Sequence, residues 1–235
     1  LWWPQLGPMF WLRALPCSRA GLWPILPLMA KISAPFAPQP KRHGKLMARI
    51  VFDLDGTLID SAPDIRAAVN LMLVEQGLAP LSLSEVIGFI GNGLPHLVTL
   101  VMAARGIDPA RHAELSPCVA RHYDAVNGQE TVLYPGVAGA LAALHAAGHS
   151  LALCTNKPEA PARACLAQMG IAALFDQVIG GDSLPRRKPD PAPLHACTPD
   201  IYIGDSEVDA ETASRAAVRF VLFTEGYRNT AVAEL

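Results

Sequence analysis

Short apolar runs alternate with helical segments through the C-terminal half of the chain, and this alternation restricts the fold more than any other feature. Strands alternating with helices pair in parallel through right-handed crossovers, with helices on both faces of the sheet. A further strand is expected at Arg49–Leu54, where a β-branched and apolar run ends in a turn. The sequence therefore predicts an α/β fold with a Rossmann-like parallel sheet. The expected strands are 150–154, 177–179, 201–203 and 220–223, and the expected helices are 137–147, 159–169, 192–197 and 208–217.

A wholly helical stretch interrupts this alternation directly after the first strand. Helices are expected at 61–76, 84–90, 94–105 and 110–126, joined by short polar segments. Because they fall between the first and second strands, we interpret residues 61–132 as a helical cap inserted into an α/β core. The predicted core is residues 47–60 and 133–235.

Residues 1–46 differ in charge from the rest of the chain. They hold six basic residues, no acidic residue and all four tryptophans, whereas the remainder holds 13 basic and 21 acidic residues. Their apolar stretch 21–30 is broken by Pro24 and Pro27, and a membrane-spanning helix needs about 20 mostly apolar residues. We therefore expect no stable membrane insertion and an extension outside the functional core. A targeting segment and a membrane-surface segment stay open as alternatives.

Composition excludes two classes of protein. The net charge of −2 does not suit a strongly basic nucleic-acid binder. Five scattered cysteines without a CxxC pair argue against a disulfide scaffold and for a reducing compartment, so we expect a cytoplasmic protein. We expect a monomer or a small homo-oligomer.

Polar side chains follow four of the expected strands, each at the strand's carboxyl end. These ends meet at one edge of a parallel sheet, where ligands bind in open α/β folds. Four carboxylates, a hydroxyl and an ammonium are therefore expected to converge. The residues are Asp53 and Asp55 after the first strand, Thr155 and Asn156 after the second, Lys188 beyond the third, and Asp205 and Asp209 after the fourth.

Such a cluster of oxygen ligands suits a divalent cation. Converging carboxylates repel one another, and a hard ion such as Mg²⁺ removes that penalty and also binds phosphate. Two carboxylates spaced as Asp53 and Asp55 can divide the work of nucleophile and proton carrier. Thr155 and Lys188 offer a hydroxyl donor and a positive charge to an incoming phosphate. The residues alone thus indicate metal-assisted phosphoryl transfer through an aspartyl-phosphate intermediate.

These motifs, in this order, resemble those of the haloacid dehalogenase-like hydrolases, over residues 48–235. They read Asp-Leu-Asp-Gly-Thr at 53–57, Thr-Asn at 155–156, Lys-Pro-Asp-Pro at 188–191 and Gly-Asp-Ser-Glu-Val-Asp at 204–209. The intervening segments at 89–94, 153–158 and 224–228 look most like the bacterial phosphoglycolate phosphatase branch. That branch implies hydrolysis of 2-phosphoglycolate to glycolate and phosphate.

The resemblance also implies roles for single residues. It implies Asp53 as nucleophile and metal ligand, and Asp55 as general acid and base that also contacts the metal. It implies Asp205 as a Mg²⁺ ligand with Asp209 supporting the metal shell. By the same resemblance, the transferred phosphate of a small phosphorylated metabolite is bound by Thr155, Asn156 and Lys188.

Three departures from the family pattern leave other functions open. Only 15 residues separate Lys188 from Gly204, which leaves room for a stunted crossover helix. Ala217 stands where relatives often carry a turn glycine, and the chain ends at Leu235 without a further element. The alternatives are a phosphosugar mutase, a pyrophosphatase of the same family, or a catalytically impaired remnant.

Overall fold

The computed structural model describes residues 47–235, so the predictions on residues 1–46 lie outside the described part of the chain. Within it, a five-stranded sheet has the order β5-β4-β1-β6-β7, and all its neighbouring strands pair in parallel. The α/β fold class predicted from the sequence is therefore confirmed. The strands are β1 (Arg49–Phe52), β4 (Ser150–Cys154), β5 (Gln177–Ile179), β6 (Ile201–Gly204) and β7 (Arg219–Leu222).

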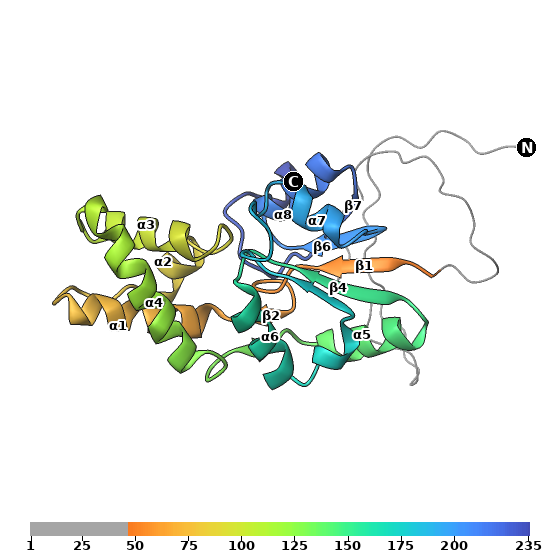
Figure 1. Ribbon diagram of the computed structural model, residues 1–235, viewed down its shortest axis with the longest axis horizontal. Helices are drawn as coiled ribbons and strands as arrows, with labels where there is room; N and C mark the ends of the chain where they lie inside the picture. Colours follow the sequence, from red (N-terminus) through yellow and green to blue (C-terminus); the bar gives the residue numbers. More distant parts are fainter. Residues whose placement is uncertain (1–46) are drawn as a thin grey trace, which may run out of the picture.

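Helices cover both faces of this sheet because the strands are apolar on both faces. In β1, Ile50 and Phe52 point into one apolar cluster and Val51 into the other, as the two-residue period of a strand requires. α5 (Val137–Ala146) and α6 (Glu159–Gln168) cover the first face (Figure 1). α7 (Ala192–Ala196) and α8 (Glu207–Ala216) cover the second.

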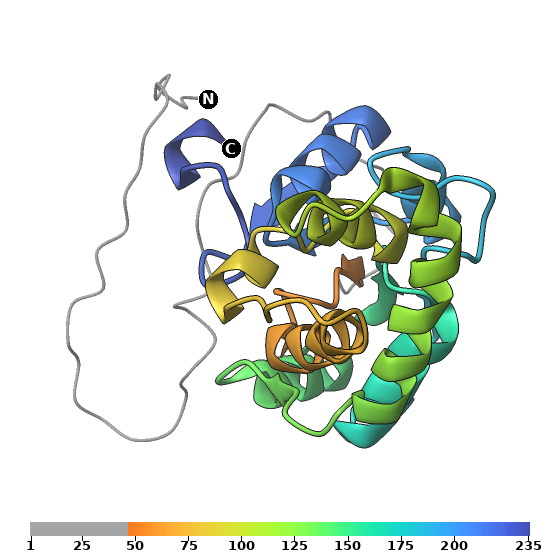
Figure 2. The same cartoon turned by 90° about the vertical axis from the view of Figure 1, so that its left-hand side faces the viewer.

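Four helices between β1 and β4 form a separate bundle at one end of the sheet. Figure 2 looks onto it. The bundle has its own apolar cluster, which includes Val69, Val98 and Val119. Its helices are α1 (Ala62–Glu75), α2 (Leu83–Ile87), α3 (Leu94–Ala104) and α4 (His112–Val126).

An antiparallel ribbon of two short strands joins the bundle to the core. β2 (Ile59–Asp60) enters the bundle and β3 (Val132–Leu133) leaves it, with Ile59 opposite Leu133. The sequence analysis missed this ribbon, because two residues are too few to show a strand period. Otherwise the element ends differ from expectation by a few residues. Short 3₁₀ turns occur at Pro109–Arg111, Ala172–Leu174 and Val232–Glu234.

The crossover between β5 and β6 is short, as expected, yet it closes. Its helix α7 has five residues, and Leu194 and Cys197 are fully buried in the second cluster. Asp200, at the end of the crossover, accepts a hydrogen bond from the backbone of Arg49 at 2.7 Å. The short connection therefore still sets β6 beside β1 in regular register.

Two further features bear on earlier expectations. Ala217, which stands where relatives often carry a turn glycine, ends α8 with a left-handed backbone at φ +54°. No helix in residues 47–235 is long and apolar enough to cross a membrane.

Candidate active site

The loops after β1 and β6 approach each other closely at the carboxyl edge of the sheet. Asp53 extends β1 by donating its backbone N–H to Ile203 at 2.8 Å, and the buried Leu54 accepts three backbone hydrogen bonds that form the turn. Gly56 has φ +86°, and a Cβ there would lie 2.4 Å from Asp205 Oδ2. Glycine is therefore required at this turn, since it lets the Asp205 carboxylate lie against the backbone.

Three of the predicted carboxylates do come together. Oxygen atoms of Asp53, Asp205 and Asp209 lie within 4.8 Å of one another, and all three residues are buried. Asp205 accepts hydrogen bonds from Thr57 Oγ1 at 2.7 Å and from the backbone N–H of Tyr227 at 2.6 Å. Burial raises the pKa of Asp205 well above its ordinary value, and the charge of Asp209 adds to this.

Lys188 is the cation at the centre of this carboxylate cluster. Its Nζ lies 2.9 Å from Asp53 Oδ1 and 2.7 Å from Asp209 Oδ1, and its side chain is 2% exposed. Tyr202 bonds both Lys188 and Asp209. Burial alone would raise the pKa of Asp209, but Lys188 and the hydrogen bonds from Tyr202 and Ser206 outweigh it and lower that pKa.

Asp53 is held differently from Asp209. Burial raises the pKa of Asp53 from 3.8 to about 7, although Lys188 opposes the shift. Its Oδ1 faces Lys188 without hydrogen-bond geometry, and no other described residue bonds this atom. Asp209, by contrast, has both oxygens occupied, because Ser206 donates to its Oδ2 from Oγ and backbone N–H. Asp53 therefore keeps acceptor capacity for a ligand.

Asp55 lies on the other side of the turn and faces the bundle. Its Oδ1 lies 2.8 Å from Lys157 Nζ and accepts a 2.5 Å hydrogen bond from Ser61 Oγ. Neither Lys157 nor Ser61 was among the site residues predicted from the sequence. In the structure, Ser61 is the N-cap residue of α1, but its side chain makes no capping bond and turns to Asp55 instead.

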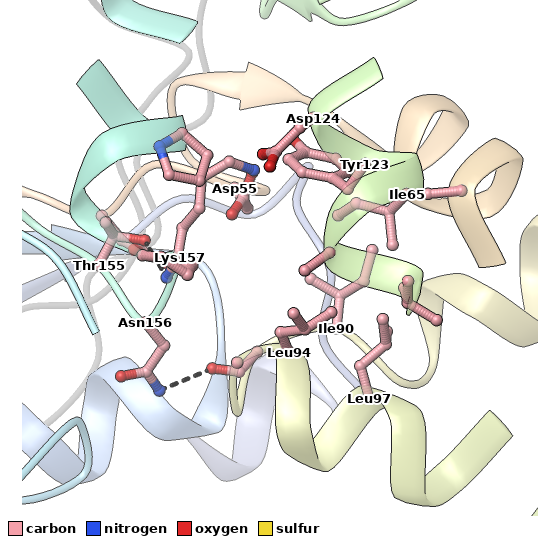
Figure 3. A pocket seen from close by; sticks show the side chains of 18 residues that line it. Asp55, Ile65, Ile90, Leu94, Leu97, Tyr123, Asp124, Thr155, Asn156 and Lys157 are labelled. Carbon is pink, nitrogen blue, oxygen red and sulfur yellow. Dashed lines mark hydrogen bonds and ion pairs between the residues drawn. The ribbon is translucent and has the colours of Figure 1, made fainter. Parts of the chain in front are cut away.

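Thr155 and Asn156 follow β4 at the same edge. Thr155 is buried, and its Oγ1 accepts a bond from the backbone N–H of Lys157 at 3.2 Å. Asn156 donates through Nδ2 to the carbonyls of Gly91 (2.9 Å) and Lys188 (3.0 Å), and Figure 3 shows the first of these bonds. Both amide hydrogens thus tie the bundle and the Lys188 loop to the core, and the phosphate contact expected of Asn156 stays a prediction.

A cavity of about 110 Å³ lies between the sheet edge and the bundle (Figure 3). Asp53, Asp55 and Lys157 line its core side. Its bundle side is mostly apolar, and Tyr123 there has a buried hydroxyl with no hydrogen bond to any described residue. No sequence signal had indicated Tyr123. The residues that line the bundle side are Ile65, Ala68, Ile90, Gly91, Gly93, Leu94, Leu97, Val119, Ala120, Tyr123 and Asp124.

The carboxylate cluster has the donor set of a hard divalent cation. One ammonium pairs with two of the three carboxylates, so two negative charges stay uncompensated if all are ionised. Asp53, which also lines the cavity, places this donor set next to a bound ligand. Oxygen ligands without histidine or cysteine suit Mg²⁺ or Ca²⁺ better than zinc.

Comparison with known proteins decides the family. Residues 50–223 match the family model described as haloacid dehalogenase-like hydrolase. The chain belongs to this family. A phosphoglycolate phosphatase of Cereibacter sphaeroides is 54% identical over 197 residues, which cover 80% of this chain and 90% of that one. One of Rhodobacter capsulatus is 46% identical, over 77% of this chain and 86% of its own.

A solved structure agrees with this assignment. The crystal structure of a predicted phosphoglycolate phosphatase from Haemophilus somnus matches with a TM-score of 0.74 and 32% identity. The match covers 80% of this chain and 90% of that one. With its family and its relatives, the chain is a phosphatase that acts on small phosphate substrates. The resemblance inferred from the sequence motifs is confirmed.

Proposed function

We propose that this haloacid dehalogenase-like hydrolase is a Mg²⁺-dependent phosphomonoesterase that works through an aspartyl-phosphate on Asp53, with 2-phosphoglycolate as its substrate. One observation carries the mechanism. Asp53 lines the cavity with its carboxylate paired to Lys188, while Asp55, two residues on, lines the same cavity from a separate set of contacts. The relatives named phosphoglycolate phosphatase support the substrate.

In the first step, an oxygen of ionised Asp53 attacks phosphorus, and the bond from phosphorus to the leaving oxygen breaks. Protonated Asp55 gives its proton to that oxygen, so glycolate leaves as the alcohol. Lys188 and the Thr155 hydroxyl neutralise charge on the transferred phosphoryl group. Because Lys188 also bonds Asp209 and Tyr202, its ammonium is held in place before the substrate arrives.

In the second step, the Asp55 carboxylate accepts a proton from water as that water attacks phosphorus. The bond between phosphorus and Asp53 breaks, inorganic phosphate leaves, and both carboxyl groups return to their starting states. Ser61 and Lys157 fix the Asp55 carboxylate from two directions. This restraint suits a group that moves a proton in both steps.

Mg²⁺ would be held by Asp53 and Asp205, with Asp55 contributing its backbone carbonyl and Asp209 orienting the Asp205 loop. When bound, the ion supplies positive charge against the phosphate oxygens and the converging carboxylates. Asp209 fits the supporting role because its own oxygens are already used, and it accepts a hydrogen bond from the Asp205 backbone at 3.2 Å.

We propose that residues 61–132 act as a cap over a core formed by residues 47–60 and 133–235. The cavity lies where the two meet, so closure of the bundle would exclude water during the first step.

Asp53→Asn tests the assignment. We expect the variant to keep the fold, seen by circular dichroism, and to lose turnover of 2-phosphoglycolate by about 10⁴-fold or more. Wild-type phosphate release should require Mg²⁺ and stop with chelator. Undiminished turnover by Asp53→Asn would overturn the nucleophile assignment. If the wild type hydrolyses sugar phosphates or pyrophosphate faster than 2-phosphoglycolate, the substrate assignment is wrong. We also propose a cytoplasmic location, which the four described cysteines, all free, support.

A further inference from the structure

The basic side chain that lines the cavity, Lys157, has no part in binding the phosphate in the mechanism proposed above. Lys188 belongs to the carboxylate cluster, and among the described residues that line the cavity Lys157 is the one basic side chain. Its side chain is 5% exposed, so its charge is little screened by water. A buried lysine facing a substrate cavity needs a partner for each of its hydrogen-bond donors.

Lys157 has donors to spare. An ammonium group carries three N–H donors, and its one hydrogen bond to a described side chain goes to Asp55 Oδ1 at 2.8 Å. The ring of Tyr123 stacks beneath it, with Nζ 4.6 Å from the ring centroid. The remaining N–H donors of Lys157 therefore lie beside the cavity that Lys157 and Tyr123 both line.

Tyr123 adds a second unpaired group from the bundle side. Its hydroxyl is buried and makes no hydrogen bond to any described residue, although an unmade bond at a buried hydroxyl is costly. The neighbouring lining residues of α1 and α3, such as Ile65 and Leu94, have no polar side-chain atoms. A ligand that enters the cavity is the natural partner of this hydroxyl.

We propose that Lys157 and Tyr123 form a subsite for a carboxylate on the leaving group, and that this subsite selects phosphomonoesters with an anionic two-carbon leaving group. The inference rests on the proposed function and deepens it. The ammonium keeps one donor on Asp55 and gives another to the substrate carboxylate, which the Tyr123 hydroxyl also bonds. A carboxylate-bearing leaving group bound in this way brings its leaving oxygen beside Asp55, which Ser61 and Lys157 already hold in place.

The negative charges around the subsite are compatible with this assignment. Asp55 is already paired with Lys157, and Asp53 is paired with Lys188. Asp124 lines the cavity too, but it is exposed, so water screens its repulsion of an anion. The substrate carboxylate is therefore held by direct hydrogen bonds from Lys157 and Tyr123 rather than by a net positive charge of the cavity.

The test compares two esters of similar size, 2-phosphoglycolate and ethyl phosphate, by kcat/KM. Lys157→Met should lower the preference for 2-phosphoglycolate by about 10- to 100-fold, the range for one hydrogen bond to a charged group. Tyr123→Phe should lower it by about 3- to 10-fold with an unchanged or higher Tm, because it removes an unpaired buried hydroxyl. Comparing the ratio between variants cancels the different reactivity of the two esters.

Arg163→Met is the matched control, because it removes one positive charge from the exposed face of α6, outside the cavity, and should leave the ratio unchanged. If Lys157 merely orients Asp55, Lys157→Met slows both esters equally, and that result overturns the proposal. If Lys157→Met does not fold, Tyr123→Phe provides the test. A kcat/KM ratio of Tyr123→Phe equal to that of the wild type also overturns the proposal. Equal hydrolysis of both esters by the wild type refutes the subsite but leaves the phosphatase function intact. Hydrolysis of neither ester refutes both.

Discussion

Replacing Lys188 by Met removes the one ammonium that bridges Asp53 and Asp209, and its cost should depend on pH. The substitution keeps the length of the side chain but leaves two buried carboxyl groups without a cation, at sites where the lysine is 2% exposed. Breaking a buried ion pair by removing one partner costs about 3–5 kcal/mol. We expect a loss of about 4 kcal/mol in the free energy of unfolding at pH 8 in chelator.

The pH dependence follows from the pKa of Asp53. Burial raises that pKa from 3.8 to about 7, so at pH 6 Asp53 is mostly protonated and its ion pair with Lys188 contributes little. At pH 8 Asp53 is ionised in the wild type, and the pair contributes up to about 1.4 kcal/mol for the one pH unit above 7. The pKa of Asp209 is lowered, so its pairing with Lys188 contributes at both pH values. The loss should therefore be about 1.4 kcal/mol smaller at pH 6 than at pH 8.

Urea unfolding at pH 6 and pH 8, with chelator or with Mg²⁺, measures this difference. Mg²⁺ should restore more stability to Lys188→Met than it adds to the wild type, since a divalent cation replaces the missing charge. The control Arg163→Met breaks an exposed pair on α6 and should cost less than about 0.5 kcal/mol. An equal loss at both pH values, or a loss below about 1 kcal/mol at pH 8, would refute this account of the cluster.

Three further expectations concern the turns and the metal. Ala217→Gly should raise the free energy of unfolding by about 0.5–1 kcal/mol, seen as a higher Tm without altered kcat, because Ala217 sits at φ +54°; a lower Tm would contradict this. Gly56→Ala should cost about 2–4 kcal/mol and weaken Mg²⁺ binding, because its Cβ would meet Asp205 Oδ2 at 2.4 Å. Gly77→Ala, at φ +69° with nothing within 4 Å, should cost only about 1 kcal/mol by the same urea assay, and equal costs would count against the contact. The rise in Tm on adding Mg²⁺ should be larger at pH 8 than at pH 6, because Asp53 must lose its proton near pH 7 to bind the ion; a rise independent of pH would show that Asp53 is not a ligand.

The sequence by itself determined that the sheet is parallel and which edge carries the chemistry. Alternating apolar strands and helices require a parallel sheet, and the polar residues at the strand ends then have one place to meet. Asp53, Asp205 and Asp209 were predicted on this ground, and their oxygens do lie within 4.8 Å of one another.

Only the tertiary structure decided how these groups are paired. The sequence gives no sign that the side-chain amide of Asn156 donates to the carbonyls of Gly91 and Lys188. Nor does it show that the Ser61 hydroxyl donates to Asp55 instead of capping α1. Tyr123 reaches the cavity because α4 packs on α1, a contact between segments about 50 residues apart. Local propensity and strand period report on neighbours along the chain, whereas the cavity, its burial and its pKa values depend on residues brought together from the bundle and the sheet. The short crossover shows the same limit. Its length predicted a stunted helix but not how β6 is positioned, and the burial of Leu194 and the bond from Arg49 to Asp200 are what bring β6 beside β1.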